Sequence, residues 1–126
     1  MIKLMYCLRR RPDLSREEFQ EYWRERHSVL ALSLAGALGG GRYVQCHTID
    51  ASVNDTLRQS RSAPPAFDGV VELWFDDIAA MEATVSTPEG RAAGRALIAD
   101  EHNFIDAEQS PIFVVREVVM IEGELA

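Results

Sequence analysis

The chain begins with IKLMYCLRRRPDLSREEFQEYWRERH at residues 2–27, a strand pattern followed by the start of a helix. Residues 2–8 are aliphatic and aromatic, which predicts a β-strand. Ser15 and Glu18 have the spacing of a capping box, which marks a helix N-terminus. Apolar side chains then recur at near-helical spacing and predict a helix of about 20 residues that is stopped by glycines from Gly36 onward: Phe19, Tyr22, Trp23, Leu30 and Leu34.

Three further strands are predicted from runs of aliphatic and aromatic residues, at 42–49, 69–75 and 112–121. Residues 50–68 are rich in polar residues and contain two prolines in succession, so they are predicted to be a long loop. A loop of this length in a small domain is more often functional or mobile than incidental.

The second helical region is predicted in two pieces. Asp76 and Asp77 cap a short helix, and Thr87 with Pro88 begins another that runs to about Glu101. The element order is therefore β-α-β-β-α-β in one domain, 1–126. This order predicts the ferredoxin-like α+β fold, a four-stranded antiparallel sheet with its helices on one face.

The strands carry apolar residues on both faces. Successive strand residues point to opposite sides of a sheet, yet Val71, Leu73 and Phe75 alternate with Val70 and Trp74. Helices can cover only one of these faces. We therefore expect a homodimer in which two sheets pack face to face.

Composition excludes several classes of protein. With 126 residues, of which 47% are hydrophobic, the chain suits one folded domain rather than a disordered segment. Its net charge is −7, which argues against binding to nucleic acid or to an anionic membrane. The charge is uneven: residues 1–61 carry +3, including an arginine cluster at 9–11, and residues 62–126 carry −10.

Location and cysteine chemistry follow from similar arguments. No apolar stretch approaches the roughly 20 residues that span a bilayer, and no signal-peptide pattern is present. A cytoplasmic location is expected. In the predicted sheet order Cys7 and Cys46 lie about 9–10 Å apart, too far for a disulfide, so both are expected to be free thiols.

His27 is the most informative single residue. It shares the apolar face of the first helix with Phe19 and Trp23, and a titratable group there needs a hydrogen-bond partner or a role. Three interpretations stay open: a histidine satisfied by a backbone carbonyl, a general acid or base, and a metal ligand. The histidines show no metal-site spacing, and no nucleotide-binding glycine motif is present, so no metal or cofactor is predicted.

Two segments resemble a known family. Residues 12–27, PDLSREEFQEYWRERH, are similar to the opening signature of the EthD family, and residues 100–106, DEHNFID, are similar to its second motif. The resemblance implies a dimeric α/β barrel with a small-molecule pocket between the sheet and helices of each subunit. Relatives include cofactor-free dehydratases, cyclases, isomerases and decarboxylases that act on polyketides, lactones and aromatic-degradation intermediates.

The resemblance also implies roles for individual residues. The similar methylmuconolactone isomerases use a histidine at the place of His27, which is therefore expected to act as a general acid or base. Asp100 or His102 is expected to be the second proton-transfer partner, and residues 50–68 are expected to close over the pocket. The expected contacts to a small apolar or aromatic substrate come from Tyr22, Tyr43 and Trp74.

Three functions are consistent with the sequence. The first is a cofactor-independent lyase or isomerase that uses His27. The second is a non-catalytic, small-molecule-binding accessory protein of a degradation or biosynthetic operon. The third is a cofactor-free oxygenase or a haem-binding protein, because related dimeric barrels include both.

Overall fold

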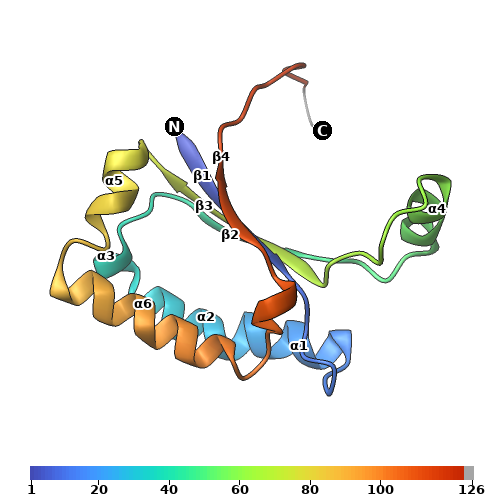
Figure 1. The fold of residues 1–126 in the computed structure, drawn as a ribbon, viewed down its shortest axis with the longest axis horizontal. Helices are drawn as coiled ribbons and strands as arrows, with labels where there is room; N and C mark the ends of the chain where they lie inside the picture. Colours follow the sequence, from blue (N-terminus) through green and yellow to red (C-terminus); the bar gives the residue numbers. More distant parts are fainter. Residues whose placement is uncertain (124–126) are drawn as a thin grey trace.

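Four antiparallel strands form one sheet in the computed structural model, which describes residues 1–123. The strands are β1 (Ile2–Leu8), β2 (Tyr43–His47), β3 (Gly69–Phe75) and β4 (Ile112–Val115), and their order in the sheet is β2-β3-β1-β4. All the helices except the one within residues 50–68 lie on one side of the sheet (Figure 1). This is the predicted ferredoxin-like α+β fold. The last three residues of the predicted domain, 124–126, lie outside the described residues.

The first helical region follows β1 and begins where the sequence predicted. It consists of α1 (Arg16–Tyr22), a π-helix η1 (Trp23–His27), α2 (Ser28–Ser33) and α3 (Ala35–Leu38). The Ser15 hydroxyl accepts a hydrogen bond from the Glu18 amide, and the Glu18 carboxylate accepts one from the Ser15 amide, both at 3.0 Å. The predicted capping box is confirmed.

The predicted glycine stop is confirmed at Gly39 but not at Gly36. The chain stays helical through Gly36 and stops at Gly39, whose φ of 76° lies in the left-handed region that favours glycine. The predicted helix is present but interrupted, because the five residues of η1 form a wider turn within it.

The second helical region contains α5 (Ile78–Ala83), α6 (Pro88–Glu101) and a 3₁₀ turn η2 (Ala107–Gln109). Its two predicted caps are confirmed. The Asp77 carboxylate accepts from the Ala80 amide at 2.7 Å, and the Thr87 hydroxyl accepts from the Gly90 amide at 3.0 Å.

Two predicted segments differ in the structure. Residues 50–68 are not all loop, since they contain α4 (Ser52–Ser60), which projects beyond one end of the sheet (Figure 1). The last strand ends at Val115 rather than at residue 121. Val115 is paired with Lys3, so β1 has almost no residues left to pair with a longer β4.

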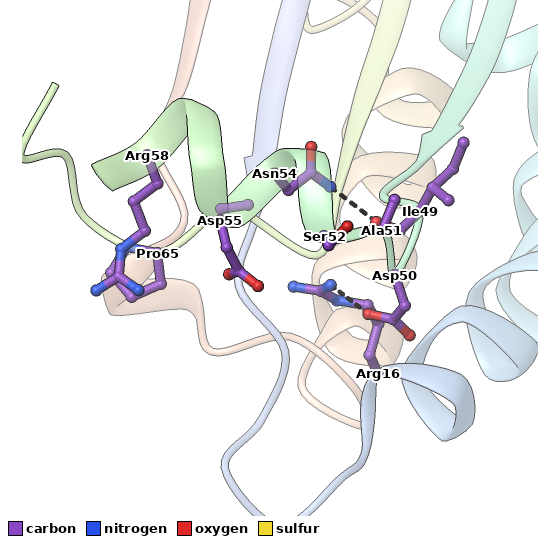
Figure 2. Close-up of a pocket in the computed structure, with 10 residues that line it drawn as sticks. Arg16, Ile49, Asp50, Ala51, Ser52, Asn54, Asp55, Arg58 and Pro65 are labelled. Atoms are coloured by element: carbon purple, nitrogen blue, oxygen red, sulfur yellow. Dashed lines mark hydrogen bonds and ion pairs between the residues drawn. The ribbon is translucent and has the colours of Figure 1, made fainter. Parts of the chain in front are cut away.

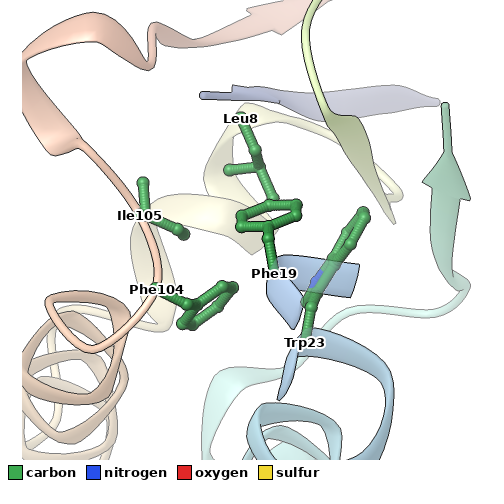
Figure 3. Close-up of a cluster of buried hydrophobic side chains, with 5 residues drawn as sticks. All are labelled: Leu8, Phe19, Trp23, Phe104 and Ile105. Atoms are coloured by element: carbon green, nitrogen blue, oxygen red, sulfur yellow. The ribbon is translucent and has the colours of Figure 1, made fainter. Parts of the chain in front are cut away.

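The core lies between the end of β1, α1 and the segment that follows α6. Figure 3 shows its five buried side chains: Leu8, Phe19, Trp23, Phe104 and Ile105. The Phe19 ring lies 5.8 Å from Trp23 and 5.5 Å from Phe104 between ring centroids. These contacts hold the helix that carries His27 against both the sheet and the end of α6.

A buried carboxylate fixes the start of α1. Asp68, fully buried just before β3, accepts hydrogen bonds from the Arg10 amide at 2.8 Å, the Arg10 guanidinium at 2.8 Å and the Arg16 Nε at 2.9 Å. It thereby ties together the end of β1, the first turn of α1 and the start of β3. Arg10, from the arginine cluster at residues 9–11, and Arg16 thus have a structural role at this junction.

The face of the sheet that points away from the helices is uncovered in the single chain. Strand alternation and the register place on it the ion pair of Lys3 and Glu72 among mostly apolar side chains: Met5, Cys7, Val44, Cys46, Val70, Trp74, Phe113 and Val115. Cys7 and Cys46 are free thiols, as predicted. Within residues 1–123, no helix is long and apolar enough to cross a membrane.

Candidate functional site

His27 and Asp100 meet where η1 passes the end of α6. The His27 Nδ1 lies 2.7 Å from Asp100 Oδ2, and the histidine is only 7% exposed. The imidazole ring also packs 4.9 Å from the Phe104 ring. The two residues that the sequence placed in different helices therefore form one acid–base pair, in which the histidine is buried and the aspartate is partly exposed.

Tyr22 and Asn103 complete the hydrogen bonds of this carboxylate. Tyr22 Oη donates to Asp100 Oδ1 at 2.7 Å, and Asn103 Nδ2 lies 3.2 Å from the same oxygen and 3.1 Å from Tyr22 Oη. Burial alone would raise the pKa of Asp100, but the hydrogen bonds from Tyr22, His27 and Asn103 outweigh it and lower that pKa. Asp100 is thus held as a carboxylate.

An ionised Asp100 determines which nitrogen of His27 can act on a ligand. A carboxylate at Nδ1 can only accept, so neutral His27 carries its proton on Nδ1 and keeps the lone pair on Nε2. In the described residues no hydrogen bond is formed at Nε2. That nitrogen is the basic atom that the site offers.

The π-helix is anchored by a strand on the opposite side of the core. Gln45 Nε2, on β2, donates to the Trp23 carbonyl at 3.2 Å, and the Ser28 amide bonds to the same carbonyl across the wide turn. The His47 ring stacks on Trp23 at 4.4 Å. Single π turns inside α-helices occur frequently at functional sites, and His27 is the last residue of this one.

A second titratable pair, Tyr6 and Glu101, lies next to the first and was not singled out from the sequence. Tyr6 Oη, from β1, donates to Glu101 Oε1 at 3.0 Å. Burial raises the pKa of Glu101 in spite of this hydrogen bond. Burial and the neighbouring Glu101 also raise the pKa of Tyr6.

The pKa values of two adjacent carboxyl groups on α6 are therefore shifted in opposite directions. The pKa of Asp100 is lowered and that of Glu101 is raised. Environments that separate the pKa values of two neighbouring acids are how enzymes assign acid and base roles. The only signal for Glu101 in the sequence is its position directly after Asp100.

The other predicted site residues lie elsewhere. His102 is exposed, and its carbonyl accepts a hydrogen bond from Arg11, so it does not join the His27 pair. Trp74 lies on the sheet face away from the helices, under the Lys3 ammonium, and so cannot line the His27 site within one chain. Tyr43 is at the edge of β2, where its hydroxyl accepts from Gln45 at 3.2 Å.

Two surface clefts flank the molecule without including His27. The larger, about 380 Å³, lies between α4 and the start of α1 and is lined by Arg16, Asp50 and Asp55 among others (Figure 2). Residues 50–68 therefore border a cleft of their own rather than cover His27. The smaller, about 280 Å³, is lined by Tyr22, Arg26 and Asn103 and lies on the outer side of the Asp100 hydrogen bonds.

The described residues contain no group of three or more His, Cys, Asp or Glu side chains that could hold a metal ion. The site is instead one imidazole, two carboxyl groups and two phenols beside a packed aromatic core. The fold and these residues define a ferredoxin-like α+β protein with an acid–base site where its first helical region meets the end of α6.

The family follows from comparison with known sequences. The EthD domain model matches residues 11–108, most of the chain. The protein belongs to the EthD family, as the two motifs indicated. A search of curated protein sequences finds no match.

Several solved structures share the fold of this chain. An EthD family protein from Bacillus halodurans is 19% identical, with a TM-score of 0.61 over 94% of this chain and 99% of its own. A dimeric ferredoxin-like protein of unknown function from Thermobifida fusca is 14% identical, with a TM-score of 0.56 over 90% and 88%. SnoaB, a cofactor-independent oxygenase from Streptomyces nogalater, is 13% identical, with a TM-score of 0.55 over 96% and 97%.

Proposed function

We propose that this EthD family protein is a cofactor-independent lyase or isomerase that moves a proton on a small apolar or aromatic molecule, such as a polyketide, a lactone or an aromatic-degradation intermediate. The observation that carries the proposal is the 2.7 Å hydrogen bond between buried His27 and Asp100. This bond leaves Nε2 as the ring nitrogen without a partner in the described residues. The residue after Asp100 is Glu101, whose pKa is raised by burial, so that its carboxyl group is protonated more readily than usual.

In the proposed reaction, Nε2 of His27 takes a proton from a carbon or hydroxyl next to a carbonyl of the substrate. Asp100 orients the ring and stabilises the imidazolium that forms. Asp100 is thus a positioning residue, and His102, which is exposed, has no part in the step. Glu101 is the candidate for returning a proton to the product.

The test is turnover of a panel of polyketides and lactones, followed by mass spectrometry. We expect His27→Ala to abolish conversion and Asp100→Asn to reduce it by about 10²–10⁴-fold, the usual contribution of acid–base catalysis. His102→Ala is the matched control, because it removes an exposed histidine near the same helix end. Equal rates for wild type and His27→Ala on a converted substrate would refute the catalytic role.

The same purified protein and variants distinguish three other functions. A ligand that raises the melting temperature but is recovered unchanged would indicate a non-catalytic binding protein. Oxygen uptake with quinols or anthrones would indicate an oxygenase, a function supported by the similarity to SnoaB. A Soret band in the purified protein would indicate haem binding.

We also propose that the protein is a homodimer that packs through the uncovered sheet face. The support is the apolar character of that face and the similarity to a ferredoxin-like protein described as dimeric. Sedimentation at micromolar concentration tests this, and a monomer would refute it.

A further inference from the structure

A glutamine on β2, Gln45, reaches the backbone of the turn that presents His27. Its Nε2 donates to the Trp23 carbonyl at 3.2 Å. That carbonyl also accepts from the Ser28 amide, which is the hydrogen bond between residues five apart that defines a π turn. Gln45 thus supplies, from another element of the fold, a second donor to the carbonyl at the start of the turn.

The other hydrogen bonds of Gln45 hold its amide in one orientation. A carbonyl only accepts, so the Trp23 oxygen requires the nitrogen of the Gln45 amide. The same nitrogen donates to Tyr43 Oη at 3.2 Å, and Gln45 Oε1 lies 2.8 Å from Nε2 of His47. Because Oε1 only accepts, neutral His47 carries its proton on Nε2. The amide orientation of Gln45 and the tautomer of His47 are therefore fixed together.

The second ring nitrogen of His47 bears the cost of this arrangement. Within the described residues, His47 Nδ1 is buried and has no hydrogen-bond partner. Buried polar atoms are nearly always hydrogen-bonded, and an exception calls for an explanation. Burial lowers the pKa of His47, and the charge of Arg24 lowers it further. His47 is thus held neutral, with its one proton on the nitrogen that faces Gln45.

Trp23 is held by its ring as well as by its carbonyl. The ring stacks on His47, with 4.4 Å between the ring centroids and 26° between the ring planes. It also occupies the space above Gly69, the direct partner of His47 in the register, because a Cβ at that position would overlap the ring. The first residue of the π turn is therefore fixed by β2 and β3, and its last residue, His27, is fixed by Asp100 on α6.

We propose that Gln45, oriented by His47, is a positioning residue for the ring of His27. This role rests on the proposed function, in which Nε2 of His27 takes the proton from the substrate. Without the donor on β2, the Trp23 carbonyl is free to bond the amide four residues on, as in an α-helix. That amide belongs to His27, so the turn would narrow and rotate the imidazole relative to Asp100.

A second glutamine offers a matched control. Gln20, on α1, donates through Nε2 to the carbonyls of Thr48 and Asp68 at 2.9 and 3.1 Å. It joins the first helical region to the sheet through two amide hydrogen bonds, as Gln45 joins it through one, but it lies before the π turn. Its loss should therefore weaken the fold without turning the ring of His27.

Nitrogen NMR of the His27 imidazole tests the proposal, because it reports which ring nitrogen carries the proton and needs no substrate. The signals are assigned by their absence from His27→Ala and are read at the alkaline end of the histidine titration. In wild type we expect the proton on Nδ1, which faces Asp100. In Gln45→Met we expect a mixture of the two tautomers, and in Gln20→Met we expect the wild-type pattern.

Kinetics on a converted substrate give a second readout. Gln45→Met should lower kcat by about 10–10²-fold with little change in KM, which is the effect of misplacing a catalytic group. Gln20→Met should keep the kcat of wild type. His47→Phe covers the case in which Gln45→Met does not fold, because it keeps a ring against Trp23 and removes the donor to Gln45. It too should give mixed tautomers of His27.

The outcomes separate this role from the proposed function. A wild-type tautomer of His27 in folded Gln45→Met, or in His47→Phe where Gln45→Met does not fold, would overturn the positioning role and leave the proposed function standing. An equal change in Gln20→Met would also overturn it, since the effect would then be a general loosening of the helix. A wild-type protein with the His27 proton on Nε2 would refute both the proposed base and its positioning.

Discussion

Replacing Asp68 with Asn tests whether a buried ion pair holds the first helix in place. The Asp68 side chain is 1% exposed and binds the guanidinium groups of Arg10 and Arg16 as well as the Arg10 amide. Asn keeps the size and one acceptor oxygen but removes the charge. The two arginines are then left facing a neutral group at the junction of β1, α1 and β3.

The expected loss of unfolding free energy follows from how deeply the three side chains are buried. Removing one partner of a fully buried pair costs about 3–5 kcal/mol. Arg10 is 39% exposed and Arg16 is 22% exposed, so both keep part of their hydration, and we expect a loss of about 2–3 kcal/mol. For a domain of this size that lowers Tm by about 8–12 °C. Asp50→Asn is the matched control, because Asp50 also binds Arg16 but is 79% exposed, and it should cost less than about 1 kcal/mol.

The dependence of this stability difference on pH tests whether the charge of Asp68 is responsible. Burial alone would raise the pKa of Asp68, but the hydrogen bonds from Arg10 and Arg16 outweigh it and lower that pKa in the folded protein. The stability that the charge supplies is therefore complete above the ordinary value of about 3.9 and is lost as the pH falls through the lower folded-state value. The difference in unfolding free energy between wild type and Asp68→Asn, measured with urea, should be constant from about pH 7 to 5 and shrink in strong acid. A difference under about 1 kcal/mol at pH 7, or one that grows in acid, would refute the reasoning.

The remaining predictions concern α6 and the site. Gly90→Ala should lower Tm, at a cost of at least about 1–3 kcal/mol, because its Cβ would overlap the Thr84 carbonyl; the matched Gly94→Ala, whose Cβ meets nothing, should raise stability by about 0.5–1 kcal/mol. Calorimetry on both variants separates the two effects, and equal shifts of Tm would contradict the packing argument. Glu101→Gln should raise Tm at pH 7, because burial raises the pKa of Glu101 and so penalises its charged form. This gain in Tm should vanish as the pH falls through the raised pKa, where Glu101 becomes neutral. A Tm that drops at pH 7 would mean that the Tyr6 hydrogen bond outweighs the burial penalty.

The sequence predicted the structure correctly wherever a chain segment determines its own conformation. The capping box at Ser15 and the caps at Asp77 and Thr87 were all predicted and are all present. α4 was missed because its serine-rich sequence is typical of a loop and its cap, Ala51, forms no side-chain hydrogen bond. The last strand was predicted too long because its end depends on where β1 ends, which its own residues do not encode.

The site was predicted only in part for a related reason. His27 and Asp100 were both singled out, and the structure pairs them. Successive helix residues point about 100° apart, so Asp100 and Glu101 serve different neighbours, and no local pattern shows which of them is buried. Trp74 was predicted to contact the substrate, but it lies on the face of the sheet away from the helices. Both sets of alternating residues in β3 are apolar, so the sequence pattern does not show which set faces the helices.

The π-helix explains how one helix carries both the core aromatics and the acid–base histidine. An α-helix advances 100° per residue, so a step of four residues overshoots a full turn by about 40°. Two such steps from Phe19 would carry the residue at position 27 well off the buried face. A π turn bonds residues five apart and so turns less per residue, which brings His27 back beneath Trp23 toward α6. The hydrogen bond from Gln45 to the Trp23 carbonyl stabilises this wider turn from outside the helix. The site thus depends on β2 as well as on the helix that contains His27, and a change at the edge of β2 would reach the histidine through Gln45 and the backbone of the turn.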